Sequence, residues 1–276
     1  MTSILTNNGA MVALQTLQSV NKNLEETQNQ ISTGKEVGMA KDNSAVWAIS
    51  KTMESDIQAY EAVSDALNFG EATVAVASSG AEQIVDVLKE MKELIVSANS
   101  QNVDHVKIQT DIVKKQEQIT AIIGSAEFNG ANLLNEYVDA ADTESALTVL
   151  GNVDGTTTIS VAAVDMENDL DWTTTPLTPI TDAATASTAL GEIDGLIAGA
   201  INDAAALGAD AKRIDDQNEF VSKLTDSLKS GVSTMTDTNM EEASARLKAL
   251  QTQQQLAVQS LTIANSAPST LQQLFR

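Results

Sequence analysis

The clearest hydrophobic pattern of the chain lies in its last forty residues, 237–276. Small and apolar residues recur there at alternating steps of three and four, which is the spacing of a heptad seam. Thr238 and Glu241 have the spacing of a capping box, so the pattern predicts a helix that begins beside them. The seam consists of Met240, Ala243, Leu247, Leu250, Gln254, Ala257, Leu261 and Ala264. Its alanines and glutamine bury less apolar surface than large side chains, which contribute roughly 1.5–3 kcal/mol each, so this helix needs neighbours.

A second weak heptad lies at the other end of the chain, between Asn8 and Ile31. Leu14 adds to this stripe, while Asn21 and Gln28 interrupt it. The positions that recur every seven residues are Ala10, Leu17, Leu24 and Ile31. We expect the two arms to pair with each other and then with further copies of the chain. The predicted assembly interface comprises Leu14, Leu17, Leu24, Ile31, Leu247, Leu250, Ala257, Leu261, Ala264, Leu271, Leu274 and Phe275.

Long helical patterns fill most of the chain between the arms. Gly34 and Gly38 break the first arm, and Asp42 or Asn43 is placed to cap a new helix. Apolar residues then keep helical spacing from about 44 to 100 without a proline, which predicts a helix of roughly 85 Å. Gly70 and Gly80 inside this helix indicate a bend or close packing.

Two further helices are predicted on either side of a different kind of segment. Asp104 can cap a shorter helix with apolar positions from Ile108 to Ile122, and helical spacing returns from Leu190 to Met235. In between, Asn129 and Gly130 indicate a turn. The stretches ALTVL, TTTISVAAV and TTTPLTPIT read as short strands of an outer insertion.

Together these patterns predict a mainly α fold: a long antiparallel helical rod or bundle with paired N- and C-terminal coiled-coil arms and a small β-containing outer insertion. The expected parts are an N-terminal arm, the first half of the rod, the insertion, the second half of the rod and a C-terminal arm. Their ranges are 1–43, 44–135, 136–189, 190–236 and 237–276.

Charge is distributed unevenly along the chain, whose net charge is −22. The first arm has three lysines against four acidic residues, and the second arm has three of each sign, so the segment between them carries −21. Nearly neutral arms avoid repulsion between packed copies, whereas an acidic middle favours solubility. Lysine and arginine are missing between Lys115 and Lys212, which argues against binding to nucleic acid or an anionic membrane.

The residues that carry chemistry in enzymes are scarce. Cysteine is absent, and the single histidine, His105, cannot form a triad or a usual metal site alone. The alternating acidic residues Asp165, Glu167, Asp169 and Asp171 would share one face of a strand, but they lack the glycine and the terminal glutamate of a calcium loop. An exposed acidic loop is the favoured interpretation. We expect no enzymatic activity, cofactor or metal.

The sequence shows neither a membrane-spanning segment nor a cleavable secretory signal. No apolar run reaches the length of about 18 residues that a membrane-spanning helix needs. The first residues, MTSILTNNGAMVAL, have neither a basic start nor a continuous apolar core, so a cleaved secretory signal is not expected. If the protein leaves the cell, it uses another route.

Three separated motifs in this chain resemble bacterial flagellin. They are the N-terminal stretch from NNGAMVALQTLQSV through ISTG and AKDN, the FNGANLL turn, and the ending LQTQQQLAVQSLTIANSAPSTLQQLFR. The similarity covers about 1–135 and 190–276, and the short middle with AVWAIS looks like flagellins of alphaproteobacteria. In one place the chain departs from the family: Glu90 stands where members detected by the flagellin-sensing Toll-like receptor carry arginine.

The resemblance implies a structural subunit that polymerises into the flagellar filament for swimming motility. In this family the paired arms form the inner wall, the long helices surround them and the insertion faces outward. Flagellins are exported unfolded through the flagellar type III apparatus to the outside of the cell. The implied partners are further copies of the chain, an export chaperone, the filament cap and hook-junction proteins.

Two other functions were weighed against a filament subunit. A hook-filament junction protein shares the arms and helices but joins other components instead of forming long polymers. A secreted hydrolase carried on the insertion is disfavoured, because 136–189 contains no histidine, cysteine or basic residue.

Overall fold

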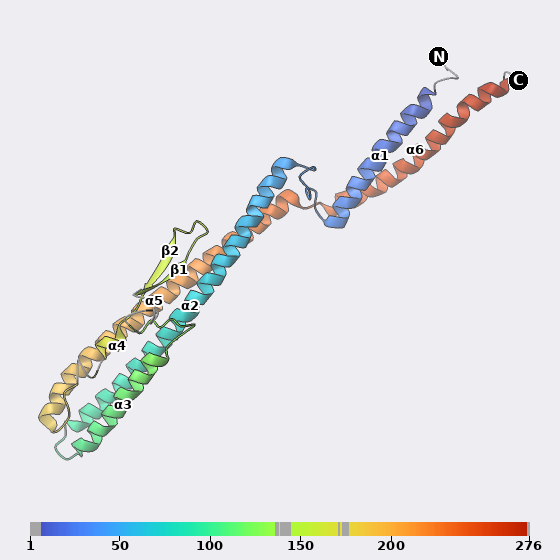
Figure 1. The fold of residues 1–276 in the computed structure, drawn as a ribbon. Helices are drawn as coiled ribbons and strands as arrows, with labels where there is room; N and C mark the ends of the chain where they lie inside the picture. The colour runs from blue at the N-terminus through green and yellow to red at the C-terminus, as the bar shows by residue number, and fades with distance from the viewer. Residues whose placement is uncertain (1–6, 136–137, 139–144, 171, 173–176, 275–276) are drawn as a thin grey trace. The chain divides into compact units, whose positions relative to one another are not determined.

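The computed structural model describes residues 7–135, 138, 145–170, 172 and 177–274, with side chains up to residue 266 (Figure 1). The described part is mainly helical, as predicted, with one small sheet. Its elements are α1 (Asn8–Thr33), α2 (Ser44–Ala98), α3 (His105–Ser125), β1 (Ala146–Leu150), β2 (Thr158–Ala162), α4 (Met166–Asp169), α5 (Ala183–Thr236) and α6 (Met240–Leu274). The chain forms two compact units, one of 1–57 with 227–276 and one of 58–226.

Several helix ends are those that the sequence predicts. The N–H of Gly34, a residue in the left-handed conformation at φ 71°, donates to the carbonyl of Gln30 and closes α1. The side chain of Asn43 accepts from the N–H of Val46 at 3.3 Å, and Asp104 accepts from the N–H of Lys107 at 3.2 Å. These local signals explain why α2 and α3 begin where the sequence places them.

The core of the 58–226 unit is built by α2, α3 and α5. Ile84, Leu88, Met91 and Ile95 line the buried side of α2 and are fully enclosed. The helical spacing of three and four residues brings these side chains onto one face. They meet Ile112 and Ile119 of α3 and Ile193, Leu207 and Ile214 of α5 in one apolar cluster.

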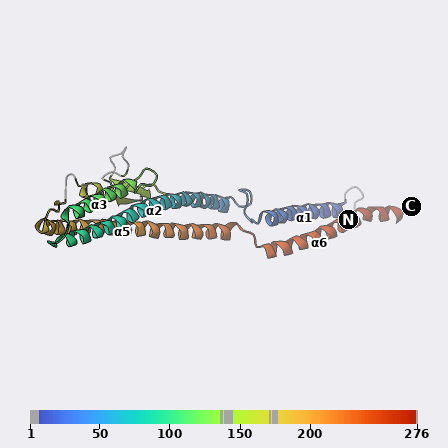
Figure 2. The ribbon, with the colours of Figure 1, turned by 90° about the horizontal axis from the view of Figure 1, so that it is seen from below.

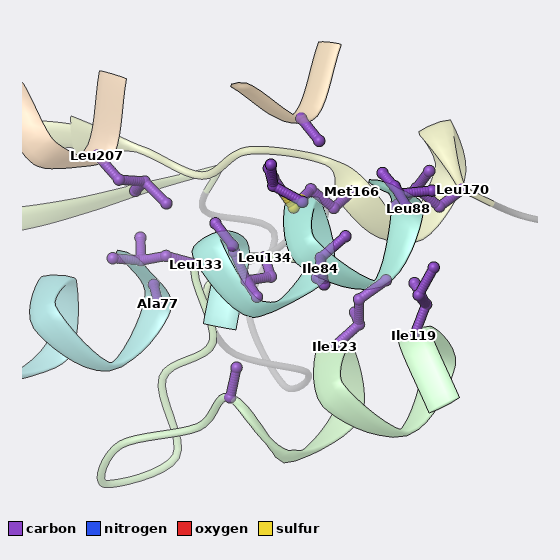
Figure 3. Packing of buried hydrophobic residues seen from close by; sticks show 14 of the residues in the cluster. Ala77, Ile84, Leu88, Ile119, Ile123, Leu133, Leu134, Met166, Leu170 and Leu207 are labelled. Carbon is purple, nitrogen blue, oxygen red and sulfur yellow. The ribbon is translucent and has the colours of Figure 1, made fainter. Parts of the chain in front are cut away.

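The FNGANLL segment is a turn that inserts two leucines into this core. Phe128 and Ala131 exchange backbone hydrogen bonds of 2.9 and 3.0 Å across Asn129 and Gly130, which have φ of 52° and 88°. Leu133 and Leu134 are fully buried and point toward α2 (Figure 3). The predicted turn is confirmed, and it places Leu133 and Leu134 in the core after the end of α3.

The hairpin β1–β2 is antiparallel, with Ala146 paired to Ala162 and Leu150 to Thr158. Gly70 makes room for it on α2, because a Cβ at this position would lie 2.5 Å from Cγ2 of Val149. A Cβ on Gly80 would likewise lie 3.0 Å from Cδ1 of Leu134. The close packing expected at both glycines is therefore confirmed.

Parts of the predicted insertion are wrong. Residues 177–182 form no strand, and the start of the TTTPLTPIT stretch, 173–176, lies outside the described residues. The acidic stretch, for which an exposed loop is the favoured interpretation, contains the helical turn α4. Helix α5 begins at Ala183 rather than at residue 190, because the Asp182 carboxylate accepts from the N–H groups of Ala184 and Thr185 at 2.9 and 2.8 Å. Asp182 is therefore the local signal in the sequence that sets the start of this helix.

Candidate assembly interface

The two arms lie side by side as antiparallel helices in the unit formed by the chain ends. Figures 1 and 2 both show α1 along α6. Hydrogen bonds join the pair at both ends: the amide nitrogen of Asn7 donates to the carbonyl of Ala264 at 2.7 Å, and the N–H of Thr238 donates to the carbonyl of Gly34 at 2.9 Å. Asn21 and Gln254 are linked at 2.7 Å between them. The pairing of the arms that the sequence predicts is confirmed.

The seam of α6 follows the predicted alternation of three and four residues. Ala243, Leu250 and Ala257 are buried, and the partly buried seam positions are Leu247, Gln254, Leu261 and Ala264. Met240 was predicted to lie in the seam, but it is the first residue of α6 and is 46% exposed. The buried side chains are mostly small, so the contact between the arms is narrow.

The seam of α1 differs from the prediction at the positions between Ala10, Leu17, Leu24 and Ile31. Leu14 is 47% exposed and lies outside the seam, because Ala13 occupies the position between Ala10 and Leu17. The inward positions of α1 are Ala10, Ala13, Leu17, Val20, Leu24, Thr27 and Ile31. Ala13, Val20 and Thr27 were missed because the predicted set with Leu14, Asn21 and Gln28 also alternates in steps of three and four, so spacing alone cannot choose between the two sets.

Three residues of the predicted interface remain predictions. Leu271 and Leu274 belong to α6 by their backbone, but their side chains lie outside the described residues. Phe275 lies outside the described residues altogether.

The start of α6 corrects the predicted capping box. Asn239 is the cap: its side-chain oxygen accepts from the N–H groups of Glu241 and Glu242 at 3.2 and 3.4 Å. The hydroxyl of Thr238 is buried and has no hydrogen-bond partner in the described part of the chain. Thr238 cannot cap the helix because its backbone is held against Gly34 in the bridge between the two linkers. The first turn of α6 therefore begins one residue later than the box requires.

The two linkers at the base of the arms are joined by backbone hydrogen bonds. Lys35 and Asp237 form an isolated antiparallel bridge, and the N–H of Glu36 donates to the carbonyl of Thr236 at 2.7 Å. Nearby, a hydrogen bond from Lys51 and the charge of Lys35 lower the pKa of Glu54. The base of each arm is thus tied to the base of the other.

Large apolar side chains also lie on the outward sides of both arms. They are exposed in the single chain: Met11, Val12, Leu14, Leu256, Val258 and Ile263. Between α1 and α6 runs a groove of about 610 Å³ whose wall includes Val12, Thr16, Leu256 and Ser260. Apolar surface of this kind gains free energy when a second molecule covers it.

The charged groups elsewhere form no comparable site. His105 lies at the start of α3, where Nε2 is 3.0 Å from the carbonyl of Ala98. Burial raises the pKa of Asp203, and the nearby charge of Asp169 adds to the effect. Within the described residues, no three His, Cys, Asp or Glu side chains are grouped to hold a metal ion. None of the described helices combines the length and apolar character that a membrane span requires.

Two family models match the chain on either side of the insertion. Residues 4–139 match the bacterial flagellin N-terminal helical region, and residues 190–275 match the bacterial flagellin C-terminal helical region. The first match ends just before the hairpin and α4, and the second begins within α5. The chain belongs to the bacterial flagellins.

Relatives from alphaproteobacteria match this flagellin over its whole length. A flagellin of Brucella melitensis is 40% identical over 285 residues, covering 100% of both chains. Flagellin FljO of Caulobacter vibrioides is 38% identical, covering 99% of this chain and 98% of the relative. Flagellin A of Rhizobium meliloti is 35% identical and covers 100% of both. The chain is a structural subunit of the flagellar filament, as the resemblance implies.

A solved structure shares the fold. The chain covers 100% of a putative flagellar hook-associated protein from Vibrio parahaemolyticus with a TM-score of 0.55, at 12% sequence identity and over 70% of this chain. At this identity the likeness shows the architecture alone. It does not favour a junction protein over a filament subunit.

Proposed function

We propose that the arms, 1–43 and 237–276, are the surface through which this subunit polymerises, and that they become rigid only when other copies surround them. The observation that supports this is the pairing of a narrow seam with apolar side chains on the outward sides of both helices. Leu14 supports it in particular, since its exposure in the single chain leaves it available to a neighbouring copy. Contacts that repeat head to tail without closing generate a helical filament.

The balance of energies explains why the arms would depend on neighbours. Ordering an arm of about forty residues costs about 1–2 kcal/mol of backbone entropy per residue. A seam in which alanines are as numerous as leucines, with a threonine and a glutamine among them, buries too little apolar surface to offset this in a solitary chain. In a filament every side of each helix is covered, so folding of the arms is coupled to polymerisation.

The remaining parts of the proposal follow from membership in the family. The helical parts 44–135 and 190–236 surround the arms, and 136–189 faces the solvent. The protein is exported through the flagellar type III apparatus and acts outside the cell. An export chaperone, the filament cap and hook-junction proteins are its further partners, and it performs no catalysis.

A charge placed on the arms tests the assembly surface. Ala257→Asp should abolish filaments while the 44–236 part remains folded, because a carboxylate in the seam cannot be paired there. Ile263→Asp tests contacts between copies more directly, since Ile263 is exposed in the single chain. Thr156→Asp places the same charge in the exposed hairpin turn and should leave filaments intact. Normal filament yield from both arm variants in sedimentation assays would remove the arms from the interface.

Circular dichroism tests the coupling between folding and assembly. The far-ultraviolet signal should show additional helix when soluble subunits polymerise, and equal helicity before and after would refute the coupling. Electron microscopy after seeding separates the two related functions. Long filaments are expected for a filament subunit, whereas short or absent polymers would favour a junction protein.

A further inference from the structure

The tip of the paired arms contains a proline inside a helix. Helix α6 runs from Met240 to Leu274 and includes Pro268, the only proline in this range of the sequence. In an α-helix each carbonyl accepts from the N–H four residues later. Because proline has no N–H, the carbonyl of Ala264 cannot receive this hydrogen bond. It is the one carbonyl in the interior of α6 that a proline deprives of its helical donor.

Asn7 supplies the missing donor from the other arm. Its amide nitrogen donates to the carbonyl of Ala264 at 2.7 Å, and its side-chain oxygen accepts from the N–H of Ala10 at 3.1 Å. One side chain thereby caps α1 and satisfies the carbonyl that Pro268 leaves open. An ionised Asp has acceptors but no donor, so it could cap Ala10 but could not donate to the carbonyl of Ala264.

The apolar seam at the tip discriminates poorly between alternative alignments of the arms. Its side chains are alanines for the most part: Ala10 and Ala13 on α1, and Ala257 and Ala264 on α6. A shift of α6 by one heptad would put Ala257 in the place of Ala264, so the end of the seam would still carry an alanine, while Leu250 would take the place of Ala257. The hydrogen bond would change completely, because the carbonyl of Ala257 already has the N–H of Leu261 as its helical donor.

We propose that Asn7 and Pro268 are positioning residues that fix the register in which the arms pair. Pro268 leaves the carbonyl of Ala264 without its helical donor, and Asn7 donates to this carbonyl in the alignment in which the backbone bonds between the linkers also form. The inference builds on the proposed function, because the register decides which apolar side chains of α1 and α6 lie together on the surface that neighbouring copies cover.

Disulfide trapping tests the register, and the chain suits it because it contains no cysteine. A Cβ on Gly9 would lie 3.9 Å from Cβ of Ala264, which is within the range of a disulfide. The pair Gly9→Cys with Ala264→Cys therefore reports the observed register, and Gly9→Cys with Ala257→Cys reports a shift of one heptad. Mild oxidation is applied to filaments in which cysteine-bearing subunits are diluted with cysteine-free ones, and also to the soluble chain.

The expected result is a change in the ratio of the two cross-links. Asn7→Asp keeps the cap on Ala10 but removes the donor, so the ratio of observed to shifted register should fall about fivefold or more. Asn8→Asp is the matched control, with the same change in charge at a neighbouring exposed position, and should leave the ratio unchanged. Pro268→Ala restores an N–H to α6, so it should lower the ratio by itself and reduce the additional effect of Asn7→Asp to less than twofold.

The opposite results overturn the proposal. It fails if Asn7→Asp behaves like Asn8→Asp, or if its effect is the same with and without Pro268. If Asn7→Asp prevents assembly and Asn8→Asp does not, recovery of filaments on adding Pro268→Ala supports the proposal, and no recovery overturns it. The proposed function fails differently, since Ala257→Asp and Ile263→Asp would then form filaments in normal yield, whereas the register is measured by the cross-link ratio of Asn7→Asp against Asn8→Asp.

Discussion

At the scale of single residues, a glycine inside a helix can be explained by a residue that is distant in the sequence. Gly70 in the middle of α2 has an obvious local effect, since glycine weakens a helix by about 1 kcal/mol relative to alanine. Its benefit is visible only in the fold, where Val149 of β1 occupies the space that a side chain would fill. The helix loses some stability at Gly70, and in return the hairpin can pack closely against α2.

The first prediction is that Gly70→Ala lowers the free energy of unfolding by about 1–3 kcal/mol, because the new Cβ overlaps with Val149. Thermal unfolding of the soluble chain measures it. Gly191→Ala in α5 is the control: a Cβ there meets open space, so this variant should be more stable by about 1 kcal/mol. Val149→Ala should recover part of the loss, and equal effects at both glycines would contradict the packing argument.

At the scale of elements, helix ends are decided by competition for backbone groups. Asp182 extends α5 toward the N-terminus because two N–H groups find its carboxylate. At α6 the sequence predicts Thr238 as the cap, but the N–H of Thr238 donates to the carbonyl of Gly34 in the other linker. Asn239 therefore caps α6, and the hydroxyl of Thr238 is buried without a hydrogen-bond partner among the described residues.

The second prediction separates the two candidate caps. Asn239→Ala should destabilise α6 by about 1 kcal/mol through loss of the cap. Thr238→Val keeps the shape of the side chain and removes the unpaired hydroxyl, so it should be neutral or stabilising. The melting temperature of assembled filaments measures both variants. A greater loss from Thr238→Val than from Asn239→Ala would show that the capping box is correct after all.

At the scale of the whole molecule, charge and assembly are divided between different parts of the chain. The arms carry almost no net charge, and the middle carries nearly all of the total of −22. Bringing many copies together therefore concentrates negative charge around neutral arms. Repulsion between the middle segments opposes polymerisation, and its range depends on the Debye length of the solution.

The third prediction is that salt promotes assembly. Raising the ionic strength from about 0.01 M to about 0.15 M shortens the Debye length from roughly 30 Å to roughly 8 Å, so the critical concentration for polymerisation should fall. Sedimentation of seeded filaments across a salt series measures it. A critical concentration that rises with salt would instead indicate that attractive ion pairs between copies dominate the interface.

The sequence by itself determined the class of the fold and the family of the protein. Periodicity of three and four residues, together with caps such as Asn43 and Asp104, depends on interactions within a few residues, so it can be read without the tertiary structure. The seam of α6 and the turn at Asn129 and Gly130 were predictable for the same reason.

Only the tertiary structure decided which of two neighbouring residues lies in the seam or caps a helix. It alone also decided which residues far apart in the sequence are in contact. Ala13 rather than Leu14 faces α6, and Asn239 rather than Thr238 caps it, because the antiparallel arms and the bridge at their base fix the rotation of each helix. The hydrogen bond from Asn7 to the carbonyl of Ala264 joins residues from nearly opposite ends of the sequence. Contacts of that separation depend on how the helices pack, and the local pattern of either helix carries no information about the other.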